Sequence, residues 1–334
     1  MKFHTIYIIA LAGALALASC GRDGGQRLPA SKGLPCELLV VSDAEIANSD
    51  LKDSVASVTE ADCPGLGSAE NIFRVNNIGA GAYTSVFYAM HSKVFFQIDK
   101  RLKRGEVGVA HNVKARPEIE VFVKAPDLET MRRLISERRE FIQQQIMEFQ
   151  VARLSTLVQG KYSKKVSDDL RAVAGYEVKM PTDMVATKRG KDFLWGGSNR
   201  AARDINFVFY TYPWDSGDIA DVDRYTERRD SVLRANIPGS RRDQWMETSR
   251  GDDGEPVVWA AMRRINGRQL MEVRGLWELR NGYMGGPFVA HVGVDTAERK
   301  VVVSEVFVFN PEGQKRDLMR QLEGCLRTLR KVRE

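Results

Sequence analysis

The residues best suited to chemistry lie between positions 274 and 291 of this 334-residue chain. Arg274 supplies a guanidinium, Trp277 an aromatic plate, Gly285 and Gly286 exposed backbone amides, and His291 an imidazole. On adjoining strands these groups would form a small site for an anionic or sugar ligand. Alternatively, Trp277 belongs to the core, the glycines form a β-bulge and His291 is a hydrogen-bonded strand residue. The residue pattern favours this second interpretation.

Known catalytic signatures are missing from the sequence. It has no HExxH, GxSxG, P-loop or CxxC motif. After the N-terminal segment only three histidines remain, His91, His111 and His291, and no two are close in sequence. A nucleophile and a base can still meet in space after folding, as in unrelated hydrolases. We therefore assign no catalytic residue from the sequence, and we expect no cofactor.

Four aspartates, Asp215, Asp218, Asp221 and Asp223, suggest a calcium site. Their spacing differs from that of an EF-hand loop, whereas an aspartate before a helix and others in its first turn are typical of a helix N-terminus. We therefore predict a helix over residues 219–236 that Asp218 caps, and no metal.

The N-terminus resembles a bacterial lipoprotein signal. Lys2 precedes an apolar run over residues 6–17, which is too short to stay in a bilayer as a span. Small residues then precede Cys20, as in a lipobox. This pattern predicts a signal peptide at 1–19 and acylation of Cys20, for example by palmitate; an ordinary signal peptide cut nearby is the alternative. Acyl chains would tether the protein to a membrane.

The mature chain is predicted to be an α+β protein with two lobes. A flexible tether over residues 20–34 leads to an N-terminal βα-type lobe at 35–160, which includes a strand at 37–42 and a long connecting helix at 127–158. Asp127 is in the N-cap region of this helix, and Gly160 is expected to end it. The C-terminal lobe at 161–334 is expected to be an antiparallel meander covered by helices.

Turn dipeptides and helix periodicity define the C-terminal lobe. Asn266-Gly267 and Asn281-Gly282 are type I′ hairpin signals. A final helix over 312–331 places leucines and Cys325 on one stripe, which we expect to pack on the sheet. Its basic residues are expected outside: Lys315, Arg320, Arg327 and Arg330.

Two cysteines are candidates for a disulfide. Cys36 precedes the first strand and Cys63 follows the next helix, so both thiols should lie at the same end of this unit. In an oxidising compartment they could form a bond worth about 3 to 4 kcal/mol. Two buried free cysteines are the alternative.

The formal charge of +6 comes from basic residues that are scattered along the chain. Nucleic acid is not an expected partner outside the cytoplasm. Acidic lipid headgroups or anionic glycans could bind, but charges this dispersed are typical of a solvated surface.

Several runs in the C-terminal lobe resemble a family of Bacteroidetes lipoproteins that is classed only as a domain of unknown function, family 4837. The resemblance is expected to cover nearly the whole mature chain. It implies a cell-envelope lipoprotein without an established activity, and it provides no catalytic residues to carry over. The runs are RDSVL at 229–233, NIPG at 236–239, RGLW at 274–277, and MGGPFV at 284–289 followed by His291.

We therefore expect a membrane-tethered envelope protein with a non-enzymatic binding or scaffolding role; the alternative is an envelope hydrolase acting on glycan or peptide. The expected partners are the membrane, through the lipid anchor, and other envelope proteins or glycans. The expected location is the outer membrane facing the periplasm, with the cell surface as the alternative. Tryptophan and arginine dominate binding hot spots, and all five tryptophans lie in the C-terminal lobe. We therefore predict that its meander holds the binding surface.

Overall fold

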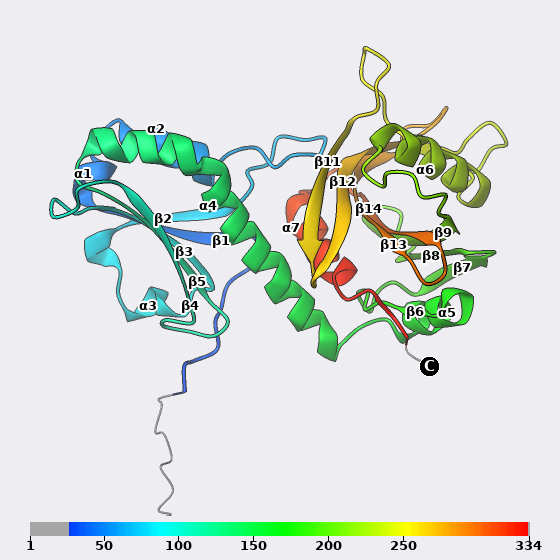
Figure 1. Ribbon diagram of the computed structural model, residues 1–334, viewed down its shortest axis with the longest axis horizontal. Helices are drawn as coiled ribbons and strands as arrows, with labels where there is room; N and C mark the ends of the chain where they lie inside the picture. Colours follow the sequence, from blue (N-terminus) through cyan, green and yellow to red (C-terminus); the bar gives the residue numbers. More distant parts are fainter. Residues whose placement is uncertain (1–26, 333–334) are drawn as a thin grey trace, which may run out of the picture.

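The computed structural model describes residues 27–332, which form two lobes side by side, joined by the long helix α4 (Leu128–Leu157) (Figure 1). The predicted signal peptide and Cys20 lie outside these residues. Among the described residues, no helix has both the length and the apolarity needed to cross a membrane. The predicted α+β fold is confirmed, with an N-terminal sheet, a connecting helix and an antiparallel C-terminal sheet that carries helices.

The chain contacts the first lobe before the predicted tether ends at residue 34. The Arg116 amide donates to Pro29 O at 2.9 Å, and the Lys32 amide donates to Ala89 O at 2.6 Å. Backbone hydrogen bonds therefore hold the chain on this lobe from residue 29 onward.

The first lobe contains a five-stranded sheet in the order β2-β1-β3-β5-β4. β1, β2, β3 and β5 are parallel, and β4 is antiparallel to β5. The predicted strand-and-helix start of a βαβ unit is confirmed, because the chain leaves β1 through two helices and returns as β2 beside it. The strands are β1 (Glu37–Ser42), β2 (Arg74–Gly79), β3 (Ser92–Ile98), β4 (Glu106–His111) and β5 (Ile119–Ala125).

Different elements cover the two faces of this sheet. Helices α2 and α4 bury one face in an apolar cluster that includes Val55 and Ile135. On the other face, a smaller cluster packs Phe95 against Tyr83 and Phe87 from a short helical segment. The helices are α1 (Ala44–Ala47), α2 (Leu51–Thr59), the 3₁₀ turn η1 (Ala80–Ala82) and α3 (Ser85–Tyr88).

Helix α4 belongs to both lobes. As predicted, Asp127 caps it by accepting a hydrogen bond from the Thr130 amide at 2.8 Å. With 30 residues it is about 45 Å long. Its first half packs on the sheet of the first lobe and its second half packs on α7 (Arg316–Leu326). The 3₁₀ turn η2 (Val158–Gly160) ends it at the predicted position.

The second lobe is one curved antiparallel sheet in the order β10-β12-β13-β14-β9-β8-β7, with β11 also paired to β12. Asn266 and Gly267 both have positive φ, which confirms the predicted hairpin between β11 and β12. In the second predicted hairpin only Asn281 has a positive φ, so that connection is a longer loop. The strands are β7 (Ala186–Gly190), β8 (Phe193–Gly197), β9 (Asp204–Pro213), β10 (Met246–Thr248), β11 (Val258–Ile265), β12 (Arg268–Leu279), β13 (Gly285–Asp295) and β14 (Lys300–Phe309).

Helices cover both faces of the second sheet. Helix α6 (Val222–Asn236) packs on one face through Tyr225 and Leu233, whereas α5 (Lys164–Ala174) and α7 pack on the other. Asp221 caps α6 by accepting from the Arg224 amide at 3.0 Å, so the prediction that Asp218 is the cap was wrong by three residues. The short strands β6 (Tyr176–Glu177) and β15 (Arg330–Lys331) pair near the C-terminus.

The last helix is shorter than predicted and is covered on two sides. It ends at Leu326 because the chain then turns to form β15, where the Val332 amide donates to Gly175 O at 2.8 Å. Its close approach to α4 depends on Gly324, since a Cβ there would lie 2.8 Å from Leu154 Cβ. Arg320 was expected in solvent but is buried, because α7 lies between the sheet and α4.

Candidate functional site

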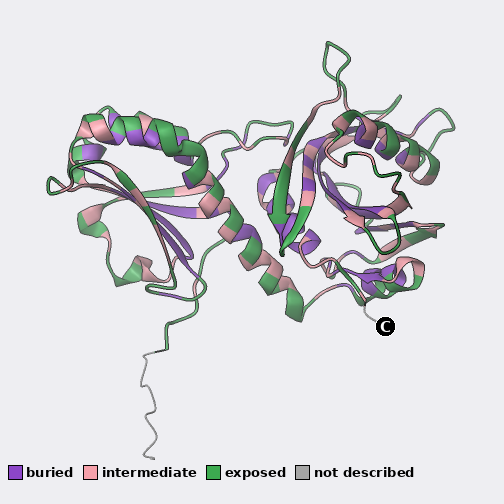
Figure 2. Cartoon of the chain, viewed as in Figure 1, coloured by how far each residue is buried: buried purple, intermediate pink, exposed green. Residues whose placement is uncertain are grey.

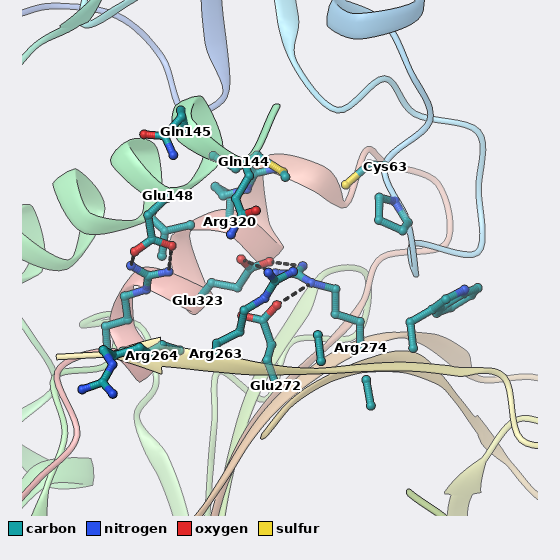
Figure 3. Close-up of a pocket in the computed structure, with 18 residues that line it drawn as sticks. Cys63, Gln144, Gln145, Glu148, Arg263, Arg264, Glu272, Arg274, Arg320 and Glu323 are labelled. Atoms are coloured by element: carbon teal, nitrogen blue, oxygen red, sulfur yellow. Dashed lines mark hydrogen bonds and ion pairs between the residues drawn. The ribbon is translucent and has the colours of Figure 1, made fainter. Parts of the chain in front are cut away.

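The main functional candidate is a cleft between the lobes. It has a volume of about 530 Å³ and is bounded by α4, α7, the β11–β12 hairpin and the loop at Cys63 and Pro64 (Figure 3). Pockets of this size, about 300 to 1,000 Å³, commonly hold small ligands. The cleft uses the predicted meander, but helices from both lobes complete it.

The register of the hairpin decides which side chains face the cleft. Trp259 pairs with Arg274 and Ala261 pairs with Glu272 across β11 and β12. Directly opposed residues share one face of a sheet, so these four side chains lie on the same face. Arg263, two residues beyond Ala261, is on this face as well.

Arg274 lies at the centre of an ion-pair cluster. Its guanidinium donates to both carboxylate oxygens of Glu323 on α7, at 2.7 and 2.9 Å, and to Glu272 at 3.2 Å (Figure 3). Burial raises the pKa of each glutamate, but Arg274 and the other cationic groups nearby together outweigh burial and hold both pKa values below their usual range. Both carboxylates are therefore ionised and bound to Arg274, which leaves this arginine little capacity for a ligand.

Arg320 differs from Arg274 in having no carboxylate partner. It is 3% exposed and lines the cleft, yet among the described residues no carboxylate oxygen lies within 4.0 Å of its guanidinium. Its hydrogen bond is a long one, 3.4 Å, to the side-chain oxygen of Gln150 on α4, and the charge of Glu323, which is more than 4.0 Å away, helps to raise its pKa. A buried guanidinium needs several acceptors to replace its lost hydration. Arg320 is therefore prepared for an anionic group.

The charges that line the cleft do not balance. Five arginines and three glutamates line it. Each glutamate already has an arginine partner, because Glu148 binds Arg327 while Glu272 and Glu323 bind Arg274. Of the other three arginines, Arg264 donates to Gly267 O at 3.4 Å, and Arg263 and Arg320 have no carboxylate partner in the described part of the chain. This excess of positive charge makes the cleft suited to an anion.

The structure separates the predicted binding residues. Trp277 lies three residues beyond Arg274 and faces the α6 side, where it is 4% exposed and packs edge-on against Phe307. Its indole N–H donates to Val308 O at 3.3 Å. Gly285 and Gly286 serve close strand packing, since a Cβ at Gly286 would lie 2.1 Å from Val308 O. These three residues line a separate hollow of about 530 Å³, which includes neither Arg274 nor His291.

His291 is the predicted residue that stays near Arg274, through a shared partner. Its Nε2 lies 3.9 Å from an oxygen of Glu272, and Ser304 pairs with it on the next strand. Glu272, His291 and Ser304 thus form a row across three strands. However, His291 and Ser304 are 5% and 1% exposed, and the cavity beside them measures about 40 Å³. It has room for about one water molecule and none for a glycan or peptide substrate.

The predicted disulfide partners are both free thiols in this structure. Burial raises the pKa of Cys36 to about 12 and also raises the pKa of Cys63. Both thiols lie close enough to Arg320 to feel its charge, so they are at the same end of the unit, as the sequence predicted. The bond itself stays a prediction. Cys63 also lines the cleft.

Sequence reasoning missed Arg320, Glu272 and Glu323. A signal existed on the last helix, because Arg320, Glu323 and Arg327 recur every three or four residues and so share a face. Glu272 and Arg274 likewise alternate on a strand, which places them on one face. The contact with α4, which turns these charged faces into a cleft, is not visible in the sequence.

Comparisons with known proteins agree with the two-lobe organisation. No curated protein matches the chain. A solved structure of a mutant of Protein Mog1 resembles it with a TM-score of 0.30 at 9% identity, covering 47% of this chain and 91% of that one. Residues 31–159 match the family model "Domain of unknown function (DUF8532)". The predicted family covers the second lobe rather than nearly the whole chain, because residues 163–328 match "Domain of unknown function (DUF4837)". Two separate parts of the chain therefore each match a family model described only as a domain of unknown function.

Proposed function

We propose that this protein is a membrane-tethered binding protein of the cell envelope, whose inter-lobe cleft receives an anionic group of its ligand. The observation that carries this proposal is Arg320, a buried guanidinium that lines a cleft of about 530 Å³ and has no carboxylate within 4.0 Å among the described residues. A free buried charge is costly. Binding of an anion would supply the missing partner.

Arg263 supports the same function from the opposite wall. It projects from β11 on the cleft side and, like Arg320, has no ion pair in the described chain. Two guanidiniums from different elements, one on the hairpin and one on α7, can hold an anion between them through charge-assisted hydrogen bonds. Glu272 and Glu323 form their ion pairs with the neighbouring Arg274, and the Arg263 charge acts on Glu272 from more than 4.0 Å away.

The alternative role as a hydrolase has less support. A hydrolase needs a nucleophile and a base that substrate can reach. In the row formed by Glu272, His291 and Ser304, the last two are buried beside a cavity of about 40 Å³, whereas Glu272 lines the inter-lobe cleft. In the inter-lobe cleft each lining glutamate is held in an ion pair, and the other charged residues that line it are arginines. Binding is the function that this geometry supports best.

The binding proposal is tested with a soluble polyanion. The protein is titrated with poly-L-glutamate at low salt, and binding is followed by calorimetry. Arg263→Ser should weaken binding about tenfold, since one charge-assisted contact is lost. Arg203→Ser, which removes an exposed arginine outside the cleft, is the matched control and should leave the affinity unchanged. Equal losses in both variants, or no binding by the native protein, would contradict the cleft as the anion site.

The tether is a separate part of the proposal. The lipobox predicts that Cys20 carries acyl chains, and two or more acyl chains are sufficient for stable membrane anchoring. Cells are fed an alkyne fatty acid, and the protein is examined for label and for membrane association. We expect labelled native protein and an unlabelled, released Cys20→Ala variant. Unlabelled native protein, or a variant that stays equally membrane-bound, would refute the lipid anchor.

A further inference from the structure

Strand β11 forms the edge of the second sheet. It pairs with β12 on one side, and among the described residues no strand pairs with its other side. Five of its eight residues are exposed, including Trp259 and Met262 at 48% and 39% (Figure 2). This free edge lies at the mouth of the inter-lobe cleft, which β11 helps to line.

The hydrogen-bond alternation of the ladder shows which backbone groups are free. The Leu276 amide donates to Val257 O at 3.1 Å, so residue 257 belongs to the hydrogen-bonded set. In an antiparallel pair this set recurs at every second residue. Trp259, Ala261 and Arg263 therefore bond to β12, whereas the amides and carbonyls of residues 260, 262 and 264 point away from the sheet. They present a regular row of donors and acceptors.

Natural proteins usually protect such an edge. Proline, inward-pointing charges, bulges or a covering element prevent a second chain from pairing with it. From Val258 to Met262, however, β11 has no proline and no charged residue. Its register with β12 is continuous from Val258 to Ile265. An unprotected row of this length is suited to strand addition by a partner.

We propose that the ligand of the cleft is an extended acidic polypeptide that pairs with β11 as an added strand and directs carboxylates toward Arg263 and Arg320. The inference rests on the proposed anion-binding function and specifies its ligand class. Charge complementarity selects the partner, since the glutamates of the cleft are already paired and these two arginines are not. Side chains at every second position of the added strand would face the cleft.

The test uses a synthetic peptide of alternating glutamate and valine that is blocked at both ends. It is about seven residues long, which corresponds to a strand of ~24 Å. Its affinity is compared with that of the same peptide carrying N-methyl groups on every backbone amide. Methylation keeps the charges but removes all backbone donors, so pairing with β11 should be lost and binding should fall at least about tenfold. This comparison requires no change in the protein.

A variant of β11 provides the complementary test. Proline is tolerated on an edge strand where its nitrogen faces away from the sheet, so Met262→Pro should keep the β12 ladder and remove one outward donor. Met262→Pro should weaken binding of the alternating peptide about tenfold, whereas Met262→Ala should leave the affinity unchanged. Unchanged circular dichroism and melting temperature check that the fold is retained.

The outcomes separate the two proposals. Equal binding of the plain and methylated peptides would overturn strand addition and leave the anion-binding function standing. Failure of both peptides and of poly-L-glutamate would overturn both. A dimer of the protein that Met262→Pro dissociates, without peptide binding, would assign the edge to a second copy. Inorganic phosphate that binds as tightly as the peptide would assign the cleft to a small anion. Each of the outcomes in this paragraph would overturn the proposal that the ligand is an acidic polypeptide.

Discussion

Two buried arginines on opposite faces of the second sheet have opposite surroundings. On the α6 face, Arg229 is 0% exposed and donates to both oxygens of Glu305, at 2.9 and 2.7 Å. It also donates to Thr248 at 2.9 Å and stacks on Phe288, with 3.9 Å between its guanidinium and the ring centre. On the α7 face, Arg320 is almost as buried but has a single long contact to Gln150.

This difference indicates on which face of the sheet the protein itself satisfies the hydrogen bonds of its buried arginine. A buried ion pair in which each guanidinium nitrogen has a hydrogen bond needs nothing further, although its net contribution to stability is small. A buried guanidinium that lacks acceptors has lost hydration without compensation. The α6 face is therefore a closed core, whereas on the α7 face an anionic ligand would, in our proposal, supply the acceptors that Arg320 lacks.

The largest expected effect is on the closed face. Glu305→Gln should lower the free energy of unfolding by about 3 to 5 kcal/mol, because Arg229 would stay buried without its counter-charge. Urea denaturation measures this change. Glu298→Gln, which alters an exposed ion pair with Lys331, is the control and should cost no more than about 1 kcal/mol. A Glu305→Gln protein as stable as the native one would contradict the closed core.

Two tryptophans extend the comparison. Trp277 is 4% exposed in the α6-side core, and Trp259 is 48% exposed at the cleft. Trp277→Ala should cost about 3 to 5 kcal/mol through the cavity it leaves, whereas Trp259→Ala should change stability by about 0.5 kcal/mol or less. Thermal and urea unfolding of the pair measure both values. Similar losses in the two variants would show that β11 is part of the core.

A buried base in the first lobe adds a third case, in which the group stays neutral. Burial lowers the pKa of His91 to about 4, and its ring nitrogens bond to Ser92 Oγ at 2.7 Å and Leu34 O at 2.9 Å. The unfolded chain takes up this proton near pH 6.5 and the folded chain only near pH 4. Stability should therefore fall as the pH is lowered from about 6.5 to about 4, by roughly 3 kcal/mol.

Unfolding measured at several pH values tests the His91 effect. The His91→Gln variant lacks the titrating group, so its stability should decline less over the same range. A native protein and a variant with parallel pH profiles would show that His91 does not cause the acid sensitivity.

A small effect on stability is expected at Arg320. Arg320→Met removes a buried charge without stranding a carboxylate, because Glu323 keeps its pairing with Arg274. The free energy of unfolding should therefore change by about 1 kcal/mol or less, in either direction. Affinity for poly-L-glutamate should nevertheless fall about tenfold. A large loss of stability would place Arg320 with Arg229 as a structural residue.

Local sequence patterns predicted most of the fold. Asp127 and Gly160 marked the ends of the long helix, and Asn266-Gly267 marked one hairpin correctly. The errors lie where distant segments decide the result. The last helix ends early because residues 330–331 pair with β6, a contact between segments far apart in sequence.

The site was harder to predict than the fold. Arg274 and His291 were chosen and do share Glu272, but Trp277 faces the other side because it is an odd number of residues from Arg274. Arg320 was assigned to solvent because helical periodicity places it opposite the leucine stripe. It is buried because α4 packs against that second side of α7. Periodicity identifies one buried face of a helix and does not reveal a second.

Hydrogen exchange on the native protein tests the central claim most directly. The exchange of backbone amides is mapped with and without the alternating glutamate–valine peptide. Our account predicts that the free amides of Ala260, Met262 and Arg264 on β11 exchange rapidly alone and become protected by the peptide, while those of α6 do not change. Protection on the α6 face, or none on β11 at saturating peptide, would contradict the assignment of the α7 side as the binding face.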